Sequence, residues 1–257
     1  MPKLEIKQRP LLTRPESFQD VPSFIAEILA RRGVESQQEL ELKLKYLLAP
    51  SMKGLPEAIQ LIDAAIDAGQ KIVIVGDYDA DGATSTALML LALRDMGADV
   101  NYLVPDRFKY GYGLTPAIAD LAFASFTPDL LITVDNGISS HDGVKQAQDH
   151  GMQVIITDHH LTTKPTPAAE AVVNPNQLGC EFPSKALAGV GVAFYVLANL
   201  STHRKKLGKS STVITNYLDL VALGTYADVA SLDYNNRILV DAGLKRIQQH
   251  LCRPGIS

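Results

Sequence analysis

Three aspartates at alternate positions in the segment GDYDADG, residues 76–82, are the residues most suited to chemistry in this sequence. They are Asp77, Asp79 and Asp81, and they follow the apolar run KIVIV, which is typical of a buried strand. Like charges at the edge of a core repel one another and lose solvation unless a positive group lies among them. The arrangement therefore indicates a site for divalent metal ions.

Acidic, amide and imidazole side chains also follow three later apolar segments. The segment VDNG ends one expected strand, TDHH ends another, and LVALGTYADV brings a further aspartate. The residues concerned are Asp135, Asn136, Asp158, His159, His160 and Asp228. In a parallel sheet, strand ends of this kind meet at one edge, where ligands bind. Carboxylates with an occasional imidazole suit Mn²⁺ or Mg²⁺, whereas structural zinc favours thiolates.

Each of these residues also has a simpler interpretation. A single aspartate after a strand is often a helix N-cap, and Asp81 fits this role for a helix beginning near Thr84. The pattern D-x-D-x-D-G also begins a calcium loop, but Leu88 stands where that loop requires a glutamate. A lone histidine at a strand end is usually only a satisfied polar residue. Four such coincidences at one edge of one sheet are improbable together, which favours the metal centre.

Apolar strands that alternate with amphipathic helices predict an α/β fold: a parallel, Rossmann-like sheet with helices on both faces. We expect strands over residues 71–77, 100–105, 130–135, 153–158 and 171–174, with helices over 56–69, 84–96, 116–125 and 140–150. A helical lead-in, residues 1–50, precedes them, with helices expected over 17–33 and 36–48. The C-terminal portion is also expected to be helical, over 185–207, 212–224 and 235–250.

The composition limits the class of protein. Of the 257 residues, 46% are hydrophobic and 20% are charged, as in ordinary soluble globular proteins. The net charge of −4 argues against broad, nonspecific binding to duplex DNA, but bound cations reverse the field locally, so a nucleic acid substrate stays possible. The sequence has no apolar run of membrane-spanning length and no signal-peptide core, so we expect a cytoplasmic protein without a membrane partner. Cys180 and Cys252 stand far apart and are expected to be reduced thiols.

The segments GDYDADG, VDNG, TDHH and ALGTYAD stand in the order of the four motifs of the DHH phosphoesterase superfamily, which this chain resembles. Several further stretches, among them PDRFKYGYGLT and DYNNRIL, resemble its branch of bacterial exonucleases specific for single-stranded DNA. The resemblance implies a DHH catalytic domain over residues 51–257, preceded by the lead-in of residues 1–50. It also leads us to expect that the family's second DHH-associated domain and its OB-type domain are missing from this chain.

The resemblance further implies a centre of two metal ions, Mn²⁺ or Mg²⁺. The implied ligands are Asp79, Asp81, Asp135, His159 and Asp228, with Asp77 and Asp158 either as ligands or as residues that orient ligands. Asp135, central in the sheet, is our choice for the carboxylate that bridges the two ions. Two such ions lower the pKa of a shared water and compensate the charge of a phosphodiester. The catalytic set is therefore predicted to be Asp135, Asp158 and His160.

Contacts with substrate phosphate are predicted for Arg107, Asn136, His160 and Arg237. His160 resembles the substrate-facing histidine of the family, and we expect it to donate to a phosphate oxygen or to the leaving group. Arg107 has the alternative of lying in a solvated loop, and Arg237 has the alternative of pairing with Asp233.

These features together predict a metal-dependent 5′-to-3′ exonuclease that hydrolyses single-stranded DNA to mononucleotides, in recombination and repair. A single-strand-binding protein and a helicase are expected as further partners. One alternative is a small-substrate phosphoesterase of the same superfamily, such as a pyrophosphatase or an oligoribonuclease-like enzyme. Those relatives place a histidine four residues before the aspartate that matches Asp79, where this chain has Val75. A second alternative is a catalytically weak or inactive chain that binds only metal and DNA.

Overall fold

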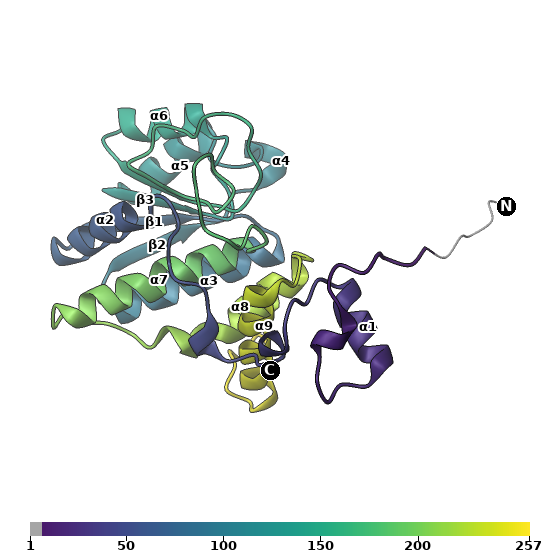
Figure 1. Ribbon diagram of the computed structural model, residues 1–257. Helices are drawn as coiled ribbons and strands as arrows, with labels where there is room; N and C mark the ends of the chain where they lie inside the picture. Colours follow the sequence, from purple (N-terminus) through teal and green to yellow (C-terminus); the bar gives the residue numbers. More distant parts are fainter. Residues whose placement is uncertain (1–6) are drawn as a thin grey trace. The chain divides into compact units, whose positions relative to one another are not determined.

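The computed structural model describes residues 7–257 and forms two compact units (Figure 1). The smaller unit ends at Tyr46, and the larger unit runs from Leu47 to Ser257. In the smaller unit, α1 (Ser23–Arg31) is the longest element, and the short 3-10 helices are η1 (Pro15–Ser17), η2 (Gln37–Leu40) and η3 (Leu44–Tyr46). Its core consists of the buried side chains Phe18, Ala26, Ala30 and Val34.

Two predictions in this lead-in need correction. The helix predicted over 17–33 begins only at Ser23, because Pro22 stands at its N-cap and favours extended backbone before it. The helix predicted over 36–48 is wrong, since only the short turns η2 and η3 form there. Their side chains are exposed or partly exposed, so no tertiary packing stabilises a longer helix, which is marginal on its own.

The larger unit is built on a five-stranded parallel sheet, which confirms the predicted α/β fold. The strands are β1 (Lys71–Val75), β2 (Asp99–Leu103), β3 (Leu130–Val134), β4 (Gln153–Thr157) and β5 (Ala171–Val173), in the order β2-β1-β3-β4-β5. Helices cover both faces, as predicted (Figure 1). One face carries α2 (Leu55–Asp67), α3 (Ala80–Asp95) and α7 (Gly189–Lys206), and the other carries α5 (Pro116–Phe126) and α6 (His141–Asp149).

Alternation along the inner strands β1, β3 and β4 explains why these strands are almost entirely apolar. Ile72 and Ile74 of β1 join the core beneath α3 and α7, whereas Val73 and Val75 join the core beneath α5 and α6. A strand that is buried on both faces has no solvent-facing positions for polar residues. The remaining elements are α4 (Arg107–Tyr110), η4 (Ile214–Tyr217), α8 (Leu218–Ala227) and α9 (Tyr234–Gln248). Within residues 7–257, no helix is long and apolar enough to cross a membrane.

The strand order creates a crevice between β1 and β3. The chain leaves β1 across one face of the sheet through α3 and reaches β3 across the other face through α5. The connections therefore diverge at the carboxyl ends of these two neighbouring strands, which is where ligands bind in sheets of this kind. The segments GDYDADG and VDNG follow these two strands, and TDHH follows the adjacent β4.

A cluster of ion pairs fastens α2 to α7 away from this crevice. Arg204 of α7 is buried and donates to Asp63 and Asp67 of α2, and Lys209 Nζ lies 2.6 Å from Asp63 Oδ2. Burial alone would raise the pKa of Asp63, but the hydrogen bonds from Lys209 and Arg204 outweigh it, so the pKa lies below its ordinary value of 3.8. The ionised carboxylate therefore stabilises the fold.

We expect Asp63→Ala to lower the free energy of unfolding by about 2 to 3 kcal/mol, because it leaves the buried Arg204 with fewer partners. Since folding lowers the pKa of Asp63, its contribution is complete above about pH 4 and is lost as the pH falls below that value. Urea unfolding of both proteins from neutral to acidic pH measures the difference. Asp67→Ala is the matched control. This more exposed carboxylate contacts the same two basic side chains, Arg204 and Lys209, and its loss should lower the free energy of unfolding much less.

Candidate metal centre

The loop between β1 and α3 brings three aspartates to the crevice. Asp79 is the N-cap of α3, and its side chain accepts a hydrogen bond from the Gly82 amide at 2.9 Å. The helix therefore begins at Ala80, before the predicted start at residue 84. Asp81 lies in the first turn and is only 2% exposed, so the interpretation of Asp81 as the N-cap is wrong.

The N-terminus of α7 holds the carboxylate of Asp81. The amide of Gly189 donates to Oδ2 at 2.6 Å, and the amide of Val190 donates to Oδ1 at 2.9 Å. Unpaired amides and the helix dipole make such a terminus favourable for a negative charge. A Cβ on residue 189 would lie 2.7 Å from both Cβ and Oδ1 of Asp135, so only glycine allows this close approach.

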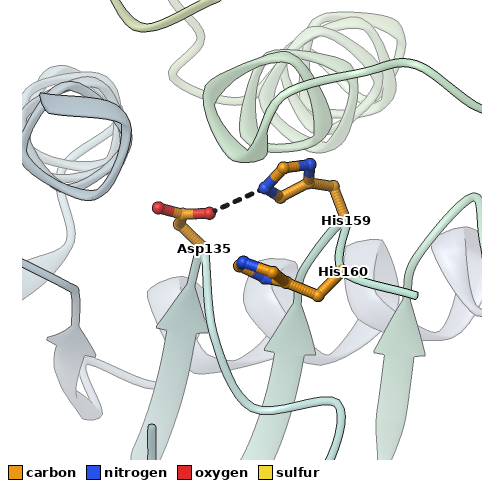
Figure 2. A group of neighbouring side chains, drawn as sticks. All are labelled: Asp135, His159 and His160. Carbon is orange, nitrogen blue, oxygen red and sulfur yellow. Dashed lines mark ion pairs between the residues drawn. The ribbon is translucent and has the colours of Figure 1, made fainter. Parts of the chain in front are cut away.

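Asp135 follows β3 directly and has an unusual backbone conformation. Its φ of 61° lies in the left-handed region, which few residues other than glycine, asparagine and aspartate adopt. Its amide donates to the Thr157 carbonyl of β4 at 3.0 Å, which fixes the turn. Oδ1 of the buried side chain lies 3.1 Å from His159 Nε2, and Asp81 Oδ2 lies 3.8 Å from the same nitrogen. Figure 2 shows Asp135 and the two histidines above the ends of neighbouring strands.

Six of the predicted ligands, with Asp77 counted among them, fall together with His160 into three overlapping groups, in each of which the possible ligand atoms lie within 4.8 Å of one another. The groups are Asp77, Asp79 and Asp135; Asp81, His159 and Asp228; and Asp135, His159 and His160. Asp135 and His159 each belong to two groups. Overlap of this kind is what two adjacent cations would need, with shared residues between them.

The charges at this place are not balanced by the side chains themselves. Burial raises the pKa of Asp135 to about 7, against the effect of its hydrogen bond with His159. Burial would lower the pKa of His159, but its contact with Asp135 and the charges of Asp81 and Asp228 raise it to about 9. In the described part of the chain, Asp135 Oδ1 and His159 Nε2 are buried without a hydrogen bond of good geometry. These residues therefore fit hard divalent cations, which would satisfy both atoms.

Asp158 supports the histidines and does not join these groups of described residues. It is 1% exposed, and its carboxylate accepts hydrogen bonds from the amides of Ile138, His159 and His160. It also contacts His160 Nδ1 at 2.7 Å. These contacts lower the pKa of Asp158 despite burial, and the same contact raises the pKa of His160. Of its two predicted roles, the geometry favours orientation over ligation.

Arg107, predicted to contact phosphate, lies at the edge of the centre. Its guanidinium pairs with Asp77 and lies near two aromatic rings, 4.2 Å from the centroid of Tyr78 and 4.9 Å from that of Tyr112. The side chain of Arg107 therefore has defined partners, which the alternative of a solvated loop did not predict. The hydroxyl of Tyr112 in turn lies 3.3 Å from His160 Nε2.

The other two residues predicted to contact phosphate lie differently. Asn136 is buried, and its side-chain amide donates to the carbonyls of Val75 and Val134, so it ties the ends of β1 and β3 together. Arg237 donates to the Leu232 carbonyl at 3.3 Å and lies over the ring of Tyr234. Leu232 lies just before helix α9, and Tyr234 is the first residue of that helix. The phosphate contacts of these two residues stay predictions.

Comparison with known proteins decides the family. A family model described as "DHH family, N-terminal domain" matches residues 71–225, which is more than half of the chain. The chain belongs to the DHH family. This match confirms the resemblance found in the motifs, and it includes the segments that end β1, β3 and β4.

Several of the relatives and solved structures that this chain matches carry the name RecJ. The chain is 48% identical to the single-stranded-DNA-specific exonuclease RecJ of Dickeya dadantii, over 98% of this chain and 45% of that protein. It therefore spans about half the length of the curated relatives it matches. A crystal structure of exonuclease RecJ bound to manganese matches with a TM-score of 0.69 and 39% identity, over 79% of this chain and 50% of that one. The Mn²⁺ complex of Thermus thermophilus RecJ matches with a TM-score of 0.74 and 35% identity, over 90% of this chain and 32% of that one.

Proposed function

We propose that this chain carries the catalytic centre of a metal-dependent exonuclease, which hydrolyses single-stranded DNA from the 5′ end to mononucleotides. The observation that carries the proposal is the convergence of six predicted ligands, from four separate segments, into overlapping groups in the crevice. The names of the RecJ relatives support the same activity. We further propose that the catalytic domain spans residues 51–257, and that the protein acts in recombination and repair with a single-strand-binding protein and a helicase.

We propose that Asp77, Asp79, Asp81, Asp135, His159 and Asp228 hold two divalent cations, Mn²⁺ or Mg²⁺. RecJ structures with each of these ions support the choice. When bound, such ions supply charge compensation for the phosphodiester and an activated water. Asp135 contributes to two groups of ligand atoms, which supports its predicted bridging role.

The remaining residues act on the substrate. Because Asp158 contacts Nδ1 of His160, Nε2, which lies 3.3 Å from the Tyr112 hydroxyl, is the nitrogen that gives a proton to a phosphate oxygen or to the leaving group. The contact with Asp158 raises the pKa of His160, which favours the protonated imidazole. Arg107, which contacts two aromatic rings, offers a planar guanidinium to a second phosphate oxygen.

Release of nucleotides from 5′-labelled and 3′-labelled single-stranded DNA with Mn²⁺ tests the function. Duplex DNA and pyrophosphate serve as the other substrates. We expect mononucleotides from the 5′ end of the single strand. Hydrolysis of pyrophosphate alone would instead indicate a small-substrate phosphoesterase. Metal binding without turnover of any of these substrates would contradict catalysis by this chain.

The α7 amides that hold Asp81 lead to a second prediction. Gly189→Ala should weaken Mn²⁺ binding by about 10- to 100-fold, because the added Cβ meets Asp135 and displaces both amides from Asp81. Isothermal titration calorimetry measures the affinity. Gly191→Ala is the matched control on the same helical turn, since its Cβ meets the flexible end of Leu187 and should leave the affinity near that of the unsubstituted chain.

A further inference from the structure

Tyr112 connects two residues that the proposed function places on the substrate. The face of its ring lies 4.9 Å from the guanidinium carbon of Arg107, and its hydroxyl lies 3.3 Å from Nε2 of His160. The ring of His160 stands nearly perpendicular to that of Tyr112, at 81°, with 6.0 Å between the ring centroids. One side chain therefore contacts Arg107 with its face and His160 with its tip.

His160 and Arg107 each have further contacts besides Tyr112. Asp158 Oδ1 lies 2.7 Å from Nδ1 of His160, so the imidazole is fixed at both nitrogens. Asp77 pairs with Arg107, and the guanidinium carbon also lies 4.2 Å from the centroid of the Tyr78 ring. Without Tyr112, His160 would keep one hydrogen-bond partner and could rotate about it. Arg107 would still keep Asp77 and Tyr78.

A hydroxyl is well suited to this position. A hydroxyl can either donate to Nε2 or accept from it, so it can be a hydrogen-bond partner of His160 in either tautomer. An apolar ring of the same size would fill the space and keep the contact with Arg107, but it would leave Nε2 without this partner.

We propose that Tyr112 is a positioning residue: it holds the imidazole of His160 and the guanidinium of Arg107 in one fixed arrangement, so that both meet the same phosphate group. This inference rests on the proposed function for its catalytic consequence, whereas the orientation of His160 can be tested without catalysis.

The kinetic test compares Tyr112→Phe with Tyr102→Phe on single-stranded DNA. Tyr112→Phe keeps the ring against Arg107 and removes only the hydroxyl, so kcat should fall about fivefold to tenfold while KM changes little. Tyr102 lies half-exposed on β2, and loss of its hydroxyl should leave both constants unchanged. In a His160→Ala background, Tyr112→Phe should have no further effect, because it acts through His160. Equal losses of kcat in both backgrounds would overturn the inference.

The second test needs no activity. The chain has six histidines, and long-range proton–nitrogen spectra of protein with ¹⁵N-labelled histidine distinguish their ring nitrogens. The signals of His160 are assigned from their loss in His160→Gln. We expect Tyr112→Phe to shift the Nε2 signal of His160, and Tyr102→Phe to leave it in place. An unchanged His160 signal in Tyr112→Phe would refute the inference, even if the exonuclease activity itself were not found.

Discussion

Asp135→Asn is expected to abolish metal-dependent hydrolysis of single-stranded DNA, with a loss in kcat on the order of a thousandfold or more. Asp135 is the carboxylate that enters two of the three groups of ligand atoms, so its charge serves both proposed ions. Asparagine is the most informative replacement because it tolerates the left-handed backbone at this position, where φ is 61°. It also has almost the same shape, so the fold should be kept. Nucleotide release from 5′-labelled DNA measures the effect.

Two measurements separate loss of chemistry from loss of structure. Thermal unfolding should show that Asp135→Asn is folded, and calorimetry should show weaker binding of Mn²⁺. Asp149→Asn is the matched control: this exposed carboxylate pairs with Lys145 on the surface of α6, and its replacement should leave activity unchanged. If Asp135→Asn bound two ions as tightly as the unsubstituted chain, the assignment of Asp135 as a shared ligand would be wrong.

The fold was largely predictable because its determinants are local and repeated along the chain. Four of the five strands are largely apolar runs, β2 alone carries an aspartate and an asparagine, and each strand was found within a few residues of its predicted bounds. The lead-in was less predictable, because a helix such as that expected over 36–48 depends on a surface to pack against. That surface depends on contacts that periodicity alone does not specify.

The candidate site was likewise predictable only in part. The structure gathers the six predicted ligands, since carboxylates and imidazoles at strand ends are visible as residue types. The amides of Gly189 and Val190 were missed as partners of Asp81, because every residue carries a backbone donor and these lie more than a hundred positions away. Tyr112 was missed for a related reason. A tyrosine in a loop has no distinguishing pattern until the fold places its hydroxyl beside His160.

Asn136 has a scaffold role that its position in the sequence did not indicate, and its phosphate contact stays a prediction. Its position after β3 suggested a side chain directed at phosphate, but both of its described donor contacts are to carbonyls at the ends of β1 and β3. A buried amide that bridges two strand ends stabilises the crevice, while the Oδ1 of Asn136 has no hydrogen-bond partner among the described residues. A polar residue at a strand end can therefore belong to the scaffold of a site as well as to its chemistry.

Metal affinity should rise steeply with pH, by about tenfold per unit between about pH 7 and pH 9, and more steeply below about pH 7. Folding raises the pKa of His159 to about 9 and that of Asp135 to about 7, so both stay protonated at higher pH than usual. A cation must displace these protons when it binds. Above about pH 7 it displaces one proton, from His159, and below about pH 7 it displaces a second one, from Asp135. Affinity therefore falls as the pH falls. Calorimetry with Mn²⁺ from about pH 6.5 to about pH 8.5 measures the slope.

Proton release gives an independent measure of the same competition. Titrations in two buffers with different heats of ionisation should show about one proton released near pH 8, where His159 is the protonated ligand. His159→Gln should bind more weakly and lose this slope above about pH 7, because the amide carries no proton that the cation must displace. An affinity that is flat with pH, with the same heat in both buffers, would mean that the cations bind elsewhere. In that case the contact between Asp135 and His159 would have no part in metal binding.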